Sequence, residues 1–204
     1  SERIAVKIRT LELLSVFDML CLVILIIIQT LTAMKMSVLN KLLEQRAYTD
    51  AHTGLPNKGA CEVLLKNKET VEKHTACIMF DLNNLKIIND TKGHSKGDQL
   101  ILNFARFLRN IIPKEAFVGR YGGDEFMVVI YNTSKTEIED ILKQLSREKD
   151  RLNSRGNDMP IDYACGWAIS DADGECTIQM LLDKADYYMY ENKQSRKKSM
   201  QSTK

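Results

Sequence analysis

Two short β-prone runs meet at a glycine pair, and this arrangement constrains the fold more than any other stretch of the chain. Residues 116–118 lead into the turn, and residues 126–130 lead out of it. Apolar runs joined by glycine predict a β-hairpin. Gly122 and Gly123 can adopt positive φ and let a ligand approach the backbone closely. The sequence therefore predicts an antiparallel hairpin with an open turn.

Two adjacent carboxylates, Asp124 and Glu125, follow the glycine pair. Adjacent carboxylates repel each other unless they share a cation or a proton. Carboxylates beside an open backbone suit a hydrated Mg²⁺ that carries a nucleotide phosphate. A solvated acidic turn is the simpler interpretation, and it is the more common one for a lone Gly-Gly-Asp-Glu. Other segments of the chain favour the nucleotide site.

Composition narrows the classes of protein that need to be considered. A chain of 204 residues with 44% hydrophobic and 27% charged side chains can hold one full domain and an appendage. Its net charge of +2 gives no reason to expect a nucleic acid partner. Five cysteines without C-x-x-C spacing argue against zinc or a disulfide framework and favour a reducing compartment. The sequence has no G-x-x-x-x-G-K-[ST] motif, which excludes a P-loop NTPase.

The N-terminal part of the chain contains a long apolar segment. Residues 19–34 carry no charge, and extension back to Leu13 adds only Asp18. Because a membrane-spanning helix needs about 20 mainly apolar residues, this segment qualifies as a transmembrane helix. A buried helix or an oligomerisation stalk is the alternative, since Asp18, Gln29 and two threonines weaken the run. Flanking basic residues are balanced and do not orient the segment.

Beyond the apolar segment, Met36, Leu39 and Leu43 fall at spacings of three and four residues. This seam resembles a short coiled coil that could extend a dimer. Gly54 and Pro56 then interrupt the chain, and Asn57 can cap a following helix. We expect residues 1–46 to form the apolar helix and stalk, residues 47–198 a catalytic domain, and residues 199–204 a tail.

A strand predicted at residues 76–80 ends at Asp81, and a carboxylate there is costly unless it is paired or binds metal. A glycine-broken loop follows and leads into a helix whose apolar face begins at Leu100. Lys86 supplies a cation of the kind that binds phosphate. Asn89 and Asp98 carry groups suited to the edge of a purine. Asp98 could also be an ordinary helix cap.

The remaining patterns predict three helices and one further strand. We expect helices at residues 58–68, 138–152 and 178–190, and a strand at residues 161–169. We expect the aromatic residues of the last strand and the last helix to lie in the core, namely Trp167, Tyr187, Tyr188 and Tyr190.

Taken together, these residues resemble a GGDEF-domain diguanylate cyclase from about Arg46 to Lys198. Four motifs in family order carry the resemblance. They are Asp50-x-x-Thr53-Gly54-Leu55-Pro56-Asn57-Lys58, Asp81-Leu82-Asn83-Asn84-Leu85-Lys86-x-x-Asn89-Asp90-x-x-Gly93-His94-x-x-Gly97-Asp98, Arg120-Tyr121-Gly122-Gly123-Asp124-Glu125-Phe126 and Ala185-Asp186-x-x-Met189-Tyr190-x-x-Lys193. Each motif is weak alone, and the ordered set is specific.

The resemblance implies an α/β (α+β) fold. This is a palm-like GGDEF domain with a mainly antiparallel five-stranded sheet flanked by helices, preceded by a long N-terminal helix. It also implies condensation of two GTP into cyclic di-GMP and two pyrophosphates. The cofactor would be Mg²⁺, two per active site, with Mn²⁺ as a substitute. Because one domain with one GTP is a half-site, a homodimer is required. The domain would be cytoplasmic, and the apolar helix would anchor it in the cytoplasmic (inner) membrane.

The resemblance also implies a role for each matching residue. The metal ligands would be Asp81, the Leu82 carbonyl and Asp124. Asp124, Glu125 and Lys86 would be catalytic, with Asp124 as proton acceptor and Lys86 stabilising charge in the transition state. Substrate would be bound by Asn89, His94, Asp98, Lys193, Gly122 and Gly123, with Lys193 on the distal phosphates and Asn89 and Asp98 on guanine.

This sequence departs from the family pattern at several positions. Asn83 stands where a second Asp is usual, and Leu85 where Phe is usual. Pro113 and Ala116 replace the Arg and Asp of the inhibitory product site that many members carry, so we expect no high-affinity product site. The alternative function is a catalytically silent GGDEF domain that binds GTP or a protein partner. A membrane adaptor role rests only on the apolar helix and the stalk.

Overall fold

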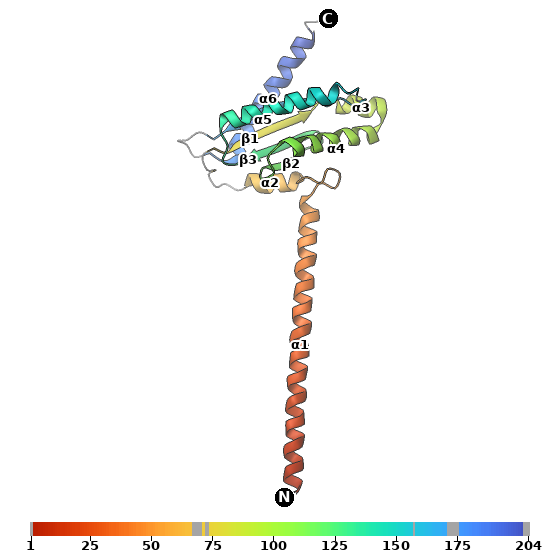
Figure 1. Cartoon of the computed structure of the whole chain (residues 1–204), viewed down its shortest axis with the longest axis vertical. Helices are drawn as coiled ribbons and strands as arrows, with labels where there is room; N and C mark the ends of the chain where they lie inside the picture. The colour runs from red at the N-terminus through yellow and green to blue at the C-terminus, as the bar shows by residue number, and fades with distance from the viewer. Residues whose placement is uncertain (1, 67–70, 72–73, 157, 171–175, 202–204) are drawn as a thin grey trace. The chain divides into compact units, whose positions relative to one another are not determined.

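The computed structural model describes residues 2–66, 71, 74–156, 158–170 and 176–201. Contacts divide the chain into two compact units, residues 1–47 and residues 48–204. The first unit is almost entirely one helix, and the second contains the sheet with the other helices (Figure 1).

Helix α1 (Glu2–Tyr48) is continuous and carries exposed apolar side chains along its length, among them Ile24, Leu39 and Leu43. Among the described residues it is the one helix that is long and apolar enough to cross a membrane. The expected long N-terminal helix is therefore present.

The sheet of the second unit is antiparallel throughout. It consists of β1 (Ala76–Leu82), β2 (Phe117–Arg120), β3 (Glu125–Ile130) and β4 (Tyr163–Ile169), in the order β2-β3-β1-β4. β2 and β3 form the predicted hairpin, with Arg120 opposite Phe126. The described residues contain four strands, one fewer than the resemblance implies.

The helices are α2 (Lys58–Lys66), α3 (Leu85–Lys92), α4 (His94–Ile111), α5 (Lys135–Asn153) and α6 (Ile178–Gln201). Asn57 caps α2 as predicted, because its Oδ1 accepts a hydrogen bond from the Ala60 N–H at 3.1 Å. Residues 67 and 68 of the expected helix lie outside the described residues. Helix α6 continues past the expected end at Tyr190, and α3 lies where we expected only loop.

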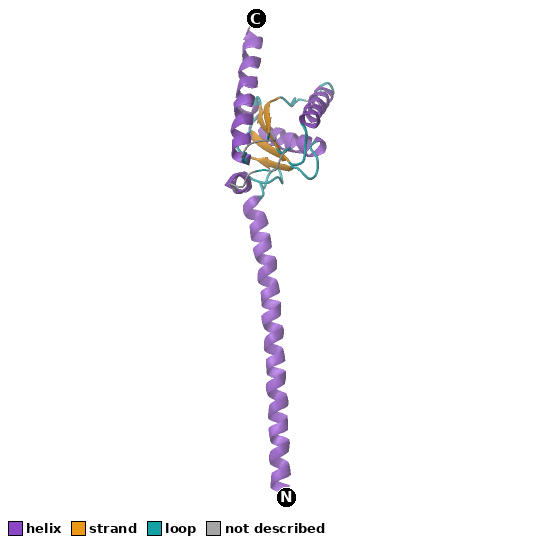
Figure 2. Cartoon of the chain, turned by 90° about the vertical axis from the view of Figure 1, so that its left-hand side faces the viewer, coloured by secondary structure: helices purple, strands orange, loops and turns teal. Residues whose placement is uncertain are grey.

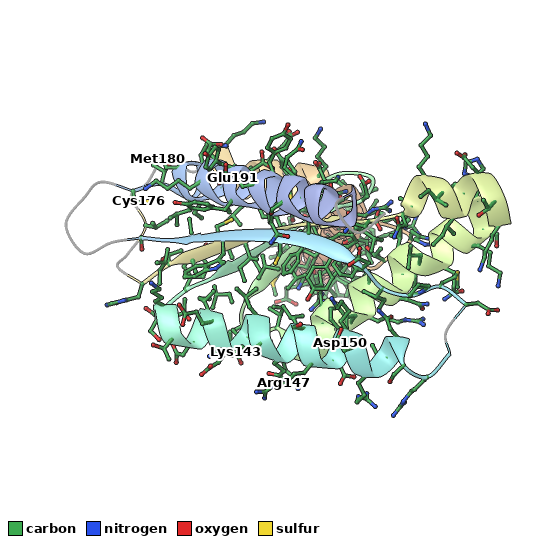
Figure 3. The ribbon with its side chains drawn as sticks, turned by 90° about the horizontal axis from the view of Figure 1, so that it is seen from above. Lys143, Arg147, Asp150, Cys176, Met180 and Glu191 are labelled. Atoms are coloured by element: carbon green, nitrogen blue, oxygen red, sulfur yellow. The ribbon has the colours of Figure 1, made fainter. Side chains whose placement is uncertain are left out.

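β1 separates two apolar layers. Ile78 and Phe80 pack with residues of α4 and α5, whereas Cys77 and Met79 pack with residues of α2 and α6. Figure 2 shows the strands between helices on either side, and Figure 3 shows α5 and α6 on opposite sides of the sheet. Every residue of β1 is buried. A strand covered on both faces reads as a continuous apolar run, and this explains why β1 is visible in the sequence.

The expectation that the tyrosines of α6 lie in the core is wrong. Tyr187, Tyr188 and Tyr190 are 58%, 53% and 59% exposed. Helix α6 buries the face that carries Leu181, Leu182, Ala185 and Met189, whose spacings of three and four residues match one helix face. The tyrosines lie outside that face. Trp167 is partly buried and packs against the core, as expected.

Candidate active site

Two carboxylates lie side by side where β1 ends and β3 begins. Asp81 and Glu125 are cross-strand partners, so their side chains project from the same face of the sheet. That face is the one covered by α6, because Asp81 lies two and four positions after Met79 and Cys77 in β1 and so shares their face. Asp81 is only 8% exposed. The sheet register therefore places a buried carboxylate beside the acidic turn.

Lys193 of α6 is the cationic partner of Asp81. Its Nζ donates to both Asp81 carboxylate oxygens at 2.7 Å. The side chains of Lys193 and Asp81 are 34% and 12% exposed, so the ion pair is partly shielded from water. The contact joins residues 112 positions apart in the sequence and brings the fourth motif to the second. Both residues were predicted as site residues from their motifs.

Negative charge accumulates at this end of the site. Burial raises the pKa of Glu125, and the charges of Asp124, Asp81 and Asp186 raise it further, while Lys193 acts in the opposite direction. Charges that repel one another across a partly buried turn favour the binding of a cation. A cation bound at this end would reduce that repulsion.

The arrangement fits a metal that arrives with its nucleotide. Among the described residues, no three His, Cys, Asp or Glu side chains form a ready metal cluster. Mg²⁺ is usually bound by one or two carboxylates together with water and substrate phosphates. Asp81 and Asp124 could supply two carboxylates, and the Leu82 N–H donates to the Asp124 carbonyl at 2.9 Å, which joins the two segments. The remaining ligands would come from Leu82 and the phosphates.

The Gly-Gly-Asp-Glu turn is held by an arginine to which we gave no role. The Arg120 guanidinium donates to the Gly123 carbonyl at 2.8 and 3.3 Å, and it pairs with the Asp50 carboxylate at 3.2 Å. Burial alone would raise the pKa of Asp50, but hydrogen bonds from Thr53 and the charge of Arg120 outweigh it and lower the pKa. An arginine two positions before the glycine pair was the available signal for this clamp.

Gly122 is needed for a close contact within the turn. A Cβ at Gly122 would lie 2.5 Å from the Glu125 Oε2, so any side chain there would displace the acidic neighbour. Its N–H donates to the Glu125 carbonyl at 3.1 Å, which closes the turn. Gly123 has open space around its Cα and is exposed. The open backbone predicted from the glycine pair is thus found at Gly123.

A second group of predicted residues lies where α3 meets α4. The chain bends at Gly93, whose φ is 86°, and there α3 ends and α4 begins. Asn89 of α3 lies against Gly97 of α4, where a Cβ would overlap the Asn89 Oδ1. Asp98 follows Gly97 directly and is exposed. The two predicted base readers therefore belong to one polar corner.

Lys86 and His94 lie at the first turns of α3 and α4, and both are exposed. The structure thus divides the predicted residues into two groups. An acidic end contains Asp81, Leu82, Asp124, Glu125, Lys193 and the glycine pair, and a polar end contains Lys86, Asn89, His94 and Asp98. An acidic end with one lysine suits a metal and phosphates, and amide and carboxylate groups suit a base. This division is typical of a nucleotide site.

Comparison with known proteins identifies the class to which this fold and site belong. Residues 47–199 match the family described as "Diguanylate cyclase, GGDEF domain". The match covers most of the chain, so the chain belongs to the GGDEF family.

Among curated proteins, the chain is 30% identical over 164 residues to the signaling protein YkoW of Bacillus subtilis, covering 77% of this chain and 20% of YkoW. It is 31% identical over 170 residues to diguanylate cyclase DgcP of Escherichia coli, covering 78% of this chain and 48% of DgcP. The chain therefore spans about half or less of the length of these relatives.

Among solved structures, the chain resembles the coiled coil and GGDEF domain of DgcB from Caulobacter crescentus in complex with c-di-GMP. The TM-score is 0.70 at 22% identity, with 82% of this chain and 91% of that chain covered. At this identity the likeness shows the fold alone. It confirms the predicted palm-like α/β domain.

Proposed function

We propose that this chain is a diguanylate cyclase that condenses two GTP into cyclic di-GMP and two pyrophosphates. The observation that carries the proposal is the complete Arg-Tyr-Gly-Gly-Asp-Glu-Phe turn, which Arg120 clamps beside the Asp81–Lys193 pair. The family membership and the diguanylate cyclase among its relatives support the same activity.

In the proposed reaction, the 3′-hydroxyl oxygen of one GTP attacks the α-phosphorus of the other. The new P–O bond forms as the bond to pyrophosphate breaks, and the hydroxyl proton passes to the Asp124 carboxylate. A second, identical transfer closes the ring. Asp81, Asp124 and the Leu82 carbonyl would hold Mg²⁺, or Mn²⁺ in its place. When bound, the metal would activate the attacking oxygen and neutralise phosphate charge.

The lysines would stabilise the phosphates. Lys193 already lies at the acidic end through its bonds to Asp81, and its ammonium could exchange that carboxylate for distal phosphate oxygens. Lys86, exposed at the first turn of α3, would stabilise charge that builds up in the transition state. Lysine suits this task because its ammonium is a compact charge on a flexible stem.

The polar end would select guanine. The Asp98 carboxylate can accept hydrogen bonds from guanine N1–H and the 2-amino group, and adenine has neither donor. Asn89 would bond to the same base, and His94, on the first turn of α4, would lie near that base. A site that hydrogen-bonds a group rejects analogues that lack that group.

The chemistry requires two copies of the domain. Each binds one GTP, and the product has two-fold symmetry, so two domains must face each other. The exposed apolar seam at Met36, Leu39 and Leu43 of α1 could pair with a second copy. GTP is cytosolic, so the catalytic domain would be cytoplasmic and the apolar part of α1 would lie in the inner membrane.

The alternative function is a silent GGDEF domain that binds GTP or a protein partner without turnover. It is disfavoured because the signature turn, Asp81 and Lys193 are all present and in contact through the sheet and α6.

One experiment separates these functions. The full chain, purified in detergent, is incubated with GTP and Mg²⁺, and the products are identified by mass spectrometry. Cyclic di-GMP is the expected product, and activity per mole should fall on dilution as dimers dissociate. GTP binding without turnover would support the silent domain, and absence of both would contradict a nucleotide site.

A further inference from the structure

The loop that follows α1 contacts both ends of the proposed site. Residues 50–55 form a compact turn in which the Asp50 N–H donates to the Leu55 carbonyl at 2.7 Å and the Gly54 N–H donates to the Asp50 carbonyl at 2.9 Å. The Thr53 N–H and hydroxyl both donate to Asp50 Oδ1, at 2.8 and 2.6 Å. Gly54 has a φ of 70°, which glycine adopts readily. The turn is thus defined by its own hydrogen bonds.

Two further features hold the loop in place. Leu55 is 1% exposed and belongs to the core of α4 and α5. Asp50 pairs with Arg120, and the Arg120 N–H donates to the Pro56 carbonyl at 2.8 Å. The loop is therefore fixed to the strand that leads into the Gly-Gly-Asp-Glu turn. The backbone position from which a side chain of this loop extends is therefore fixed.

His52 extends from this fixed loop to the polar end of the site. Its Nε2 lies 2.8 Å from the backbone carbonyl of Asp98, across 46 positions of sequence. A carbonyl can only accept, so Nε2 carries the proton in this contact. The carbonyl belongs to the residue that faces the base in the proposed function, and Gly97 before it packs on Asn89.

We infer that His52 is a positioning residue for guanine recognition, which holds Asp98 and the first turn of α4 at a fixed place relative to the catalytic turn. His52 acts through Asp98 and does not itself touch the base. The inference rests on the proposed function, because it deepens the role assigned to Asp98. The inference gives a role to His52, to which none of the four motifs assigns one.

Replacement of the imidazole should weaken nucleotide affinity without slowing chemistry. His52→Ala removes one hydrogen bond, so we expect the KM for GTP to rise about two- to tenfold with kcat nearly unchanged. His52→Gln keeps an N–H donor at similar reach and should restore much of the affinity. His74→Asn is the matched control, because His74 is exposed, lies outside the site and has a φ of 68° that Asn tolerates.

A double-mutant cycle tests whether His52 acts through Asp98. Equilibrium binding of 3′-deoxy-GTP, which lacks the attacking hydroxyl, is measured by calorimetry for the full chain with His52→Ala, Asp98→Ala and both changes. We expect the effect of His52→Ala to disappear in the Asp98→Ala background. An equal loss in both backgrounds would overturn the inference by showing that His52 acts independently, and so would an unchanged affinity in His52→Ala.

This binding measurement separates the inference from the proposed function. If the wild-type chain binds 3′-deoxy-GTP but forms no cyclic product, the proposed activity is wrong and the cycle still tests His52. If the chain turns over GTP and His52→Ala alters kcat instead of KM, the positioning role is wrong and the activity stands.

Discussion

The acidic end and the polar end of the site are built from different kinds of structure. Asp81 and Glu125 come from neighbouring strands whose register fixes their separation, and Asp81 is nearly buried. Asn89 and Asp98 come from two helices joined at Gly93, and Asp98 is exposed. Rigid strands suit chemistry that needs exact geometry, whereas a helix junction can adjust to a base. The difference suggests that turnover and base choice can be altered separately.

The largest effect should follow a change at the acidic end. Asp124→Asn keeps the size of the side chain but removes the proposed metal ligand and proton acceptor. We expect cyclic di-GMP formation to fall by about 10³-fold or more, because several kcal/mol of transition-state stabilisation are lost. The rate of product formation measures this effect, and thermal unfolding should show an intact fold.

Asp150→Asn is a matched control for Asp124→Asn. It removes one negative charge from an exposed position on α5, the helix on which Figure 3 also labels Lys143 and Arg147. The control should retain wild-type turnover. Substantial activity in Asp124→Asn would contradict the role of the acidic end.

A smaller effect should follow loss of the guanine acceptor at the polar end. Asp98→Ala should raise the KM for GTP by about 10- to 100-fold, the range for one bidentate base contact. Folding should change little because Asp98 is exposed. Steady-state kinetics provide the test, with Asp90→Ala on α3 as the control, since Asp90 is also exposed and has no assigned role. An unchanged KM in Asp98→Ala would show that Asp98 does not read the base.

Gly97→Ala should separate stability from affinity. Alanine is favoured over glycine inside a helix by about 1 kcal/mol, so α4 itself should gain stability. A Cβ there would overlap the Asn89 Oδ1, and the Asn89 side chain must move away. We therefore expect the KM for GTP to rise several-fold while the melting temperature holds or increases. Gly59→Ala in α2 is the control, and unchanged affinity in Gly97→Ala would contradict the packing of the polar end.

The smallest response should come from a region outside both ends. A hollow beside Pro113 and Ala116 is lined also by Glu115, Glu137 and Asp140. Carboxylates repel the phosphates of cyclic di-GMP, and no guanidinium lines the hollow among its described residues. Initial rates at saturating GTP should therefore stay nearly constant as cyclic di-GMP is added at low micromolar concentration. Strong non-competitive inhibition would reveal a product site elsewhere.

The acidic end was easier to predict from sequence than the polar end, and the reasons are physical. β1 and β3 are buried, so continuous apolar runs mark them, and the glycine pair marks the turn that leads from β2 into β3. Helix α3 was missed because Asn84 precedes it in a left-handed conformation (φ 65°) and its residues resemble a loop. The tyrosines of α6 were misplaced because apolar content alone does not show which face is buried.

Contacts between distant residues could not be derived from local patterns. The Arg120–Asp50 and Lys193–Asp81 pairs join segments 70 and 112 residues apart, and His52 reaches Asp98 across 46. Each depends on the packing of the sheet against its helices. The motifs identified most of these residues, and the fold supplied their partners.

The separation of the two ends is tested most directly by the ratio of affinities for 3′-deoxy-GTP and 3′-deoxy-ATP. Calorimetry would give this ratio for the wild-type chain, Asp124→Asn and Asp98→Ala. We predict that Asp124→Asn keeps the wild-type preference for guanine although turnover is lost, and that Asp98→Ala loses most of the preference. A preference lost in Asp124→Asn and kept in Asp98→Ala would contradict the assignment of chemistry to one end and base choice to the other.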